Sequence, residues 1–274
     1  MKAVQKLKLK NDQGKFICVG LDTDLEKIPH HLHSLENPIL EFNKKIIDAT
    51  SEYAAAYKIN FAFYEKLGSK GFDILLQTKE FIPKDILAIA DAKRGDIGNT
   101  SKHYADSVFN YFRFDSITIN PYMGEDSINP FLEYEDKLIF ILALTSNPGA
   151  EDFEKLQLKD GSYVFQRVIA KVNTWNKKNN CGLVFGATKL QELKENINSF
   201  GEMPVLLPGV GAQGGSLEDV MDLFIKYNKH NLLINISRGI IYKDSSPDFA
   251  AAAKYEIQTM NDKVNKLLPI KKSG

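Results

Sequence analysis

The chain has 274 residues, and its 35 lysines and arginines equal its 35 aspartates and glutamates, so the formal net charge is zero. This balance gives no general attraction for nucleic acid or for a membrane surface, and we expect neither as a partner. The only two cysteines are Cys18 and Cys181, which excludes a disulfide framework and predicts two buried, reduced thiols.

The first 13 residues alternate lysines with leucines and lack the continuous apolar run of a secretion signal. No segment approaches the ~18 uninterrupted apolar residues of a membrane span. We therefore expect a cytoplasmic protein. Because no composition break or linker divides the chain, we also expect a single domain over residues 1–274, with a short helical extension at its N-terminus.

Short apolar runs alternate with longer segments of helical periodicity. The helical spacing is clearest in residues 38–53, 163–177 and 217–227, and Ser216 with Asp219 resembles a capping box before the last of these. This alternation predicts βαβ units. Eight such units favour an α/β fold of the closed (β/α)8 TIM barrel type over a long doubly wound sheet, which the pattern alone leaves open. The predicted strands are residues 16–22, 54–60, 85–90, 116–120, 138–145, 182–187, 205–208 and 232–237.

Charged or hydrogen-bonding residues end nearly every predicted strand. The carboxyl ends of the strands carry the active site in (β/α)8 barrels, so the repetition predicts a shared polar pocket. Taken alone, Asp22 or Asn120 is better interpreted as a turn or helix-capping residue. The residues at these strand ends are Asp22, Lys58, Asn60, Asp91, Lys93, Asn120, Thr145, Ser146, Thr188, Gly209 and Arg238.

The densest cluster of charge contains Asp91, Lys93 and Asp96. On an extended strand, Asp91 and Lys93 would project to the same side because side chains alternate with a period of two. Lys58, one strand earlier, would complete an array in which each lysine offsets the desolvation of its acidic neighbours. The alternative is a surface charge cluster that opens a helix, with Asp96 as the helix cap.

A glycine-rich segment, residues 208–215, follows the seventh strand, and Arg238 and Gly239 follow the eighth. Glycines let backbone amides approach a phosphate closely, and an arginine adds a permanent charge, so we expect a phosphate site there. Residues 146–161 show no periodicity and predict a loop that contacts the substrate. The histidines form no spaced pair of ligands, so no metal site is predicted.

Several of these motifs occur together in one known family. They are VGLD at the first strand, YKIN at the second, DAKRGDIGNTS at residues 91–101, TSNPGAEDF after the fifth, PGVGAQGG after the seventh and SRGI after the eighth. The chain resembles the orotidine 5′-phosphate decarboxylases, and in particular the longer subgroup found in some bacteria and related to certain parasite enzymes. The resemblance implies the conversion of orotidine 5′-phosphate to UMP and CO2, the last step of de novo pyrimidine nucleotide synthesis. It also implies a homodimer with shared active sites and no cofactor.

The resemblance gives each matching residue a role. Lys58, Asp91, Lys93 and Asp96 match the catalytic array, in which Lys93 protonates C6 of the pyrimidine. Asp96 and Thr100 match residues that reach the partner's active site. The residues expected to bind substrate are Asp22 and Lys58 at the ribose, Thr145 or Ser146 at the pyrimidine edge, and Gln213, Gly214 and Arg238 at the phosphate. Their positions add Asn120 and Gly239 to the substrate-binding set.

Two other functions fit parts of this pattern. Metal-dependent phosphosugar decarboxylases and synthases share the aspartate-x-lysine-x-x-aspartate core, but they resemble one another in an acidic residue at the second strand end, where this chain has Lys58. A catalytically inactive nucleotide-binding protein is the second alternative. The complete lysine–aspartate array argues against it, because a protein that only binds a nucleotide has no need for so costly a cluster.

Overall fold

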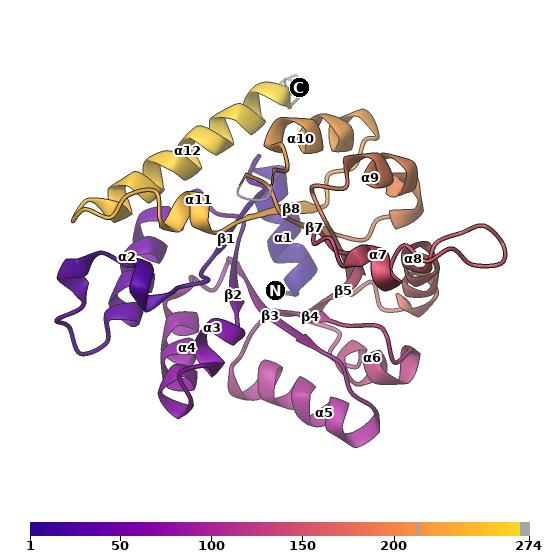
Figure 1. The fold of residues 1–274 in the computed structure, drawn as a ribbon, viewed down its shortest axis with the longest axis horizontal. Helices are drawn as coiled ribbons and strands as arrows, with labels where there is room; N and C mark the ends of the chain where they lie inside the picture. The colour runs from indigo at the N-terminus through magenta and orange to yellow at the C-terminus, as the bar shows by residue number, and fades with distance from the viewer. Residues whose placement is uncertain (212–213, 269–274) are drawn as a thin grey trace.

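Eight parallel strands close into a barrel with helices around it (Figure 1). The computed structural model describes residues 1–211 and 214–268. Each strand pairs with the next and β8 pairs with β1, so the predicted (β/α)8 barrel is confirmed and the doubly wound sheet is excluded. The strands are β1 (Ile17–Gly20), β2 (Ala56–Asn60), β3 (Leu87–Arg94), β4 (Ser116–Ile119), β5 (Leu138–Leu144), β6 (Cys181–Phe185), β7 (Val205–Pro208) and β8 (Leu232–Ile236).

The helices cover the outside of the barrel and connect its strands (Figure 1). All three segments of clear helical periodicity form helices, and Ser216 Oγ accepts the amide of Asp219 at 3.1 Å as the N-cap of α10. No helix in the described part of the chain is long and apolar enough to cross a membrane. The α-helices are α1 (Ala3–Asp12), α2 (Pro38–Thr50), α3 (Ala62–Glu65), α4 (Ser69–Phe81), α5 (Gly98–Asp106), α6 (Glu125–Leu132), α7 (Ala150–Phe153), α8 (Val164–Trp175), α9 (Leu190–Asn196), α10 (Leu217–Lys226), α11 (Arg238–Ile241) and α12 (Phe249–Leu267).

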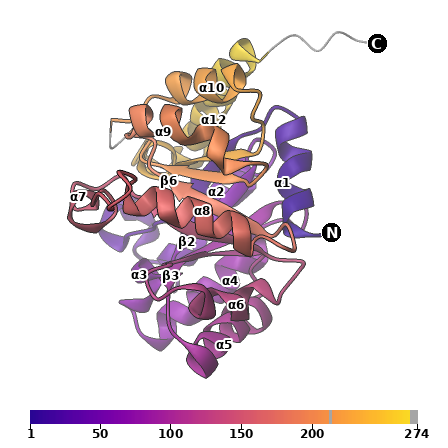
Figure 2. The same cartoon turned by 90° about the vertical axis from the view of Figure 1, so that its right-hand side faces the viewer.

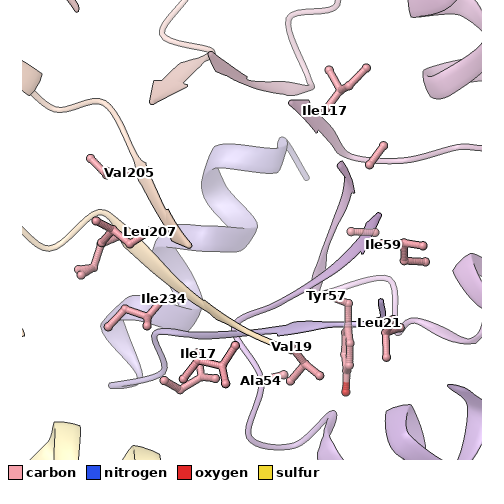
Figure 3. Close-up of a cluster of buried hydrophobic side chains, with 14 of the residues drawn as sticks. Ile17, Val19, Leu21, Ala54, Tyr57, Ile59, Ile117, Val205, Leu207 and Ile234 are labelled. Carbon is pink, nitrogen blue, oxygen red and sulfur yellow. The ribbon is translucent and has the colours of Figure 1, made fainter. Parts of the chain in front are cut away.

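Two apolar layers form the core, because alternate strand residues face opposite sides of the barrel wall. The outer layer lies between strands and helices, and Figure 3 shows part of it, including Ile17 and Val19 of β1 and Leu207 of β7. The inner layer fills the barrel itself. It contains Cys18, Ala56, Leu87, Ile89, Leu138, Phe140, Val184, Leu206 and Leu233.

Helix α1 closes the end of the barrel at which the strands begin. Its Ala3 and Leu7 belong to the inner apolar layer, and Leu7 is 1% exposed. Lys6 Nζ lies 2.7 Å from Asp115 and Lys10 Nζ lies 2.6 Å from Asp85, which precede β4 and β3. Figure 2 shows α1 at one end of the barrel and α7 at the other. The open end of the barrel is therefore the carboxyl end of the strands.

Two segments differ from the sequence expectation. Strand β3 continues through the charged cluster to Arg94, with a register shift against β4 between Ala90 and Arg94. Residues 146–161 are not structureless, because they contain the short helix α7. Glu154, which directly follows α7, binds back to Thr145, and this contact explains how the segment is ordered without helical periodicity.

Candidate active site

The carboxyl ends of the strands surround a cavity of about 340 Å³. Charged side chains from β1 to β3 line one side of it, and Leu142, Val184 and Leu206 from β5, β6 and β7 form an apolar surface on the other. This placement agrees with the rule that barrel chemistry occurs at this end. The predicted site residues that line the cavity are Asp22, Lys58, Asp91, Lys93, Thr145, Ser146 and Arg238.

The four charged residues form a continuous array. Lys58 Nζ lies 2.8 Å from Asp91 Oδ2 and 3.4 Å from Asp22 Oδ1, and Lys93 Nζ lies 2.5 Å from Asp91 Oδ1. The order is therefore Asp22, Lys58, Asp91, Lys93, with each charge beside charges of opposite sign. Only Lys93 extends substantially into open space, because its side chain is 49% exposed whereas that of Lys58 is 5% exposed.

The backbone at Lys93 brings its side chain to Asp91 in an unexpected way. Lys93 has a φ of 46°, so the chain is left-handed there and the argument from regular strand alternation is wrong at this residue. Such a conformation costs a non-glycine residue about 1–2 kcal/mol. Thr118 Oγ1 compensates by accepting the amide of Lys93 and donating to Asp91 Oδ1, both at 3.0 Å. Thr118 thus fixes both members of the pair.

Arg94, the residue that follows Lys93, is itself held firmly in place. Its guanidinium pairs with Glu65 and lies over the rings of Phe61 and Tyr104, at 5.7 and 5.4 Å from their centroids. Lys93 is therefore held between a hydrogen bond to Thr118 on one side and a stacked, ion-paired arginine on the other.

Electrostatics keep the buried part of the array ionised. Burial raises the pKa of Asp91, but the neighbouring charges of Lys58 and Lys93 outweigh it and hold the pKa below its usual range. Burial likewise lowers the pKa of Lys58, and the charges of Asp22 and Asp91 outweigh it, so the pKa is raised. Cys18, deeper in the barrel, has its pKa raised to about 12 by burial and stays a neutral thiol, as expected.

The loop after β5 carries the two candidate residues for the pyrimidine edge, Thr145 and Ser146. The hydroxyl of Thr145 lies 2.9 and 3.0 Å from the carboxylate oxygens of Glu154, which also accepts the amide of Thr145 at 2.6 Å. Thr145 is therefore engaged in holding the loop. Ser146, the next residue, lines the cavity as well.

A second cavity, of about 680 Å³, adjoins the first and shares Val210, Arg238 and Tyr242 with it. Gly239 and the N-cap residue Ser216 also line it, so the predicted glycine-rich segment and the arginine meet here. Gly214 has a φ of 92° and donates its amide to the carbonyl of Gly211 at 2.9 Å. Gln213 lies outside the described residues.

Comparisons with known proteins bear on what this site does. Residues 15–255 match the model of the orotidine 5′-phosphate decarboxylase / HUMPS family. The chain belongs to that family. An orotidine 5′-phosphate decarboxylase of Porphyromonas gingivalis is 51% identical over 249 residues, covering 89% of this chain and 90% of that protein. One from Dehalococcoides mccartyi is 45% identical over 269 residues, covering 97% and 98%.

The fold agrees with the family as well. The solved structure of Leishmania donovani OMP decarboxylase superposes with a TM-score of 0.82 at 34% identity, covering 97% of this chain and all of that one. The resemblance predicted from the sequence motifs, which included bacterial and parasite enzymes, is therefore confirmed.

Four of the predicted site residues that the structure describes line neither cavity, namely Asp96, Thr100, Asn120 and Gly214. Asp96 Oδ1 accepts the amide of the adjacent Ile97 at 2.8 Å, and α5 begins at Gly98 without a side-chain cap, so Asp96 does not cap that helix. Thr100 is exposed on α5. Asn120 Oδ1 accepts the amide of Tyr122 at 3.0 Å, which is the turn interaction favoured for this residue taken alone.

Several cavity residues were not singled out from the sequence. Ser237 Oγ donates to Asp22 Oδ2 at 2.7 Å, which fixes the first member of the array. Ser237 precedes Arg238 directly and faces inward with Asn235, so strand alternation on β8 could have indicated both. Within residues 1–211 and 214–268, no three His, Cys, Asp or Glu side chains are grouped so as to hold a metal ion.

Proposed function

We propose that this protein decarboxylates orotidine 5′-phosphate to UMP and CO2, as the last step of pyrimidine nucleotide synthesis. The observation that carries the proposal is the array Asp22–Lys58–Asp91–Lys93 in the cavity at the open end of the barrel, in a chain whose curated relatives carry the name of that enzyme.

The reaction requires a charge to be stabilised where no conjugated electron sink exists. The bond between C6 and the carboxylate breaks, its electron pair remains on C6, and CO2 leaves. We assign to Lys93 the delivery of a proton from its ammonium group to C6, after which the amine regains a proton from solvent. A preorganised cation beside the developing carbanion lowers the barrier without moving during the reaction.

Asp91 orients that ammonium group. Its Oδ1 contacts Lys93 and its Oδ2 contacts Lys58, so both oxygens are fixed and the carboxylate stays ionised. In the proposed complex the substrate carboxylate approaches Asp91, and the two negative charges disfavour the bound ground state while Lys93 attracts the carbanion that replaces it.

The remaining contacts follow the length of the nucleotide. Asp22 and Lys58 hold the ribose hydroxyls, and Arg238 binds the phosphate together with the backbone near Gly214 and Gly239 and with Gln213. At the pyrimidine edge, Thr145 or Ser146 contacts the ring, and both residues line the cavity. Binding energy from the phosphate then contributes to organising the distant reacting atoms. We propose that no metal or cofactor takes part.

We further propose that the enzyme is a homodimer with shared active sites. Asp96 and Thr100 belong to the predicted site and yet line neither cavity of their own chain. Large apolar side chains are exposed on α5 and beside it, and Tyr122 is 84% exposed, which is unusual unless a partner covers it. These side chains are Ile97, Tyr104, Tyr111, Tyr122 and Met123.

Activity is tested by following the loss of orotidine 5′-phosphate absorbance with purified protein, with and without EDTA. Rapid formation of UMP that EDTA leaves unchanged supports the proposal. Folded protein that does not turn over orotidine 5′-phosphate contradicts it, and EDTA-sensitive turnover of a phosphosugar would assign the metal-dependent function instead.

Shared active sites are tested by mixing two inactive variants, Lys93→Ala and Asp96→Ala. If Asp96 acts across the interface, each mixed dimer contains one site with both residues intact, and activity returns on mixing. A mixture that exchanges subunits and stays inactive contradicts the shared site.

A further inference from the structure

Asn235 places a buried amide on the inner wall of the cavity, and this amide is not part of the charged array. It lies on β8, is 8% exposed and lines the cavity. Its Oδ1 has no hydrogen-bond partner within residues 1–211 and 214–268. A buried polar atom without a partner destabilises the protein, so an amide in this state is expected to find its partner in a ligand.

The surroundings of Asn235 sharpen this expectation. On one side the cavity wall is formed by Leu206 of β7, with Val184 and Leu142 beyond it, whose side chains cannot hydrogen-bond. On the other side Gly20 of β1 has no side chain, and a Cβ built there would lie 3.3 Å from Asn235 Oδ1. Ser237 Oγ fills the space that a side chain at Gly20 would take, so Ser237 packs between Gly20 and the amide. Rotation by about 180° exchanges its donor and acceptor ends, so it can meet either kind of ligand atom.

The inward polar neighbours of Asn235 are already paired. Ser237, two residues later on the same face of β8, donates to Asp22, and Thr118 across the barrel donates to Asp91. Ser116 Oγ on β4 is also unpartnered within the described part of the chain, but Ser116 is fully buried and does not line the cavity. Asn235, by contrast, places its unpartnered atom in a residue that lines the space a ligand fills.

The geometry of a pyrimidine nucleotide indicates which ligand atom faces this amide, and this step rests on the proposed function. C2 and C6 are the two ring neighbours of N1, so the C2 carbonyl points obliquely away from C6 and not straight across the barrel. If C6 faces Lys93 on β3 and the ribose on N1 lies toward Asp22 after β1, then C2 lies beyond N1, toward the next strand in the closed barrel order, β8. We propose that Asn235 is a specificity-determining residue whose amide donates a hydrogen bond to the C2 carbonyl oxygen of the pyrimidine.

The test compares UMP with 2-thio-UMP, because sulfur is a poorer acceptor than oxygen at the same position. Calorimetry on the wild-type protein should show tighter binding of UMP. In Asn235→Leu, which keeps a similar volume, UMP affinity should fall about tenfold, the scale of one hydrogen bond, and the preference for oxygen over sulfur should shrink by the same factor. Asn235→Ser is the second variant, in case the leucine does not fold.

The matched control is Asn261→Leu. Asn261 is 7% exposed and its Oδ1 also has no partner among the described residues, but it lies on α12 and lines neither cavity of the candidate site. Its replacement should leave the preference for UMP unchanged. If Asn235→Leu keeps the full preference, or loses affinity for both ligands equally, the amide has only a structural role and the inference is overturned.

Measuring turnover of orotidine 5′-phosphate distinguishes a failure of the Asn235 contact from a failure of the proposed decarboxylase function. With orotidine 5′-phosphate, Asn235→Leu should raise KM while kcat changes little, because the contact is present in both the ground and transition states. Wild-type protein that binds UMP with this preference but shows no decarboxylation would reject the function and leave the Asn235 contact standing. Decarboxylation with a preference that Asn235→Leu does not alter would reject the contact alone.

Discussion

The two ends of the barrel use the same strands for opposite purposes. Along β2 and β3 the inward positions change from Ala56 to Lys58 and from Ile89 to Asp91 within two residues. The end where the strands begin is apolar and closed by Leu7 of α1, whereas the end where they finish is charged and open. Stability and chemistry are therefore separated along the barrel axis by a single layer of side chains.

We therefore expect the effect of a substitution on turnover and on folding to depend on its position along the barrel axis. Those at the open end should change turnover more than folding, and those at the closed end should do the reverse. Buried members of the charged array should change both, because they lie at the boundary.

The largest effect is expected for Lys93→Ala. Loss of the proton donor and of the cation beside C6 should lower kcat by about 10⁴-fold or more. The free energy of unfolding should change by less than about 1 kcal/mol, because half of the side chain is already in solvent. Steady-state kinetics and urea denaturation measure the two quantities. Lys178→Ala, a similarly exposed lysine paired with Glu135, is the control. Activity of the Lys93 variant within tenfold of wild type would remove Lys93 from its role.

Asp91→Ala should lower both kcat and the free energy of unfolding. Lys58, with a side chain 5% exposed, would keep only the longer 3.4 Å contact to Asp22, and a buried charge that loses its partner costs about 3–5 kcal/mol of unfolding free energy. Replacing both residues, as Lys58→Met with Asp91→Leu, should recover much of the stability but no activity. A double variant no more stable than Asp91→Ala would show that the pair is not the source of the loss.

Leu7→Ala tests the closed end. Removing a buried leucine side chain should lower the free energy of unfolding by about 3 kcal/mol, and kcat at a temperature where the variant is folded should be unchanged. Thermal and urea denaturation give the first quantity and the decarboxylation assay gives the second. A reduced kcat in fully folded protein would mean that the two ends are coupled.

The smallest expected effect is the pH dependence of the free energy of unfolding. The folded protein holds the pKa of Asp91 below its usual range, so the stabilisation is present above the unfolded value of about 3.9 and is lost as the pH falls through the folded pKa. The raised pKa of Lys58 acts in the opposite sense, with stabilisation that is full below about 10.4 and lost only as the pH rises beyond it.

The difference in unfolding free energy between wild type and Asp91→Asn should therefore be constant from about pH 5 to 9 and should narrow below about pH 4. Urea denaturation at each pH measures it. A change centred near neutral pH would show that another group controls the array.

The sequence predicted the barrel because eight apolar strands and their polar ends follow a simple period, and every predicted strand is present. It also identified Asp22, Lys58, Asp91 and Lys93, because charge after a buried strand is conspicuous. It missed Thr118, Ser237 and Asn235, since one polar residue within a strand is ordinary and its importance depends on which strands face each other. The left-handed backbone at Lys93 was also missed, because it arises from a register shift that only the pairing with β4 reveals.

Helix α1 has a consequence for the order in which the chain folds. It precedes every strand of the barrel in the chain, yet its ion-pair partners Asp85 and Asp115 lie 75 and 109 residues later, and its Leu7 shares the inner apolar layer with Leu233 on β8. A short helix without its tertiary contacts is marginal in water. Docking of α1 must therefore wait until the barrel has closed, so protection of the Leu7 amide from hydrogen exchange should be among the last signals to develop during refolding.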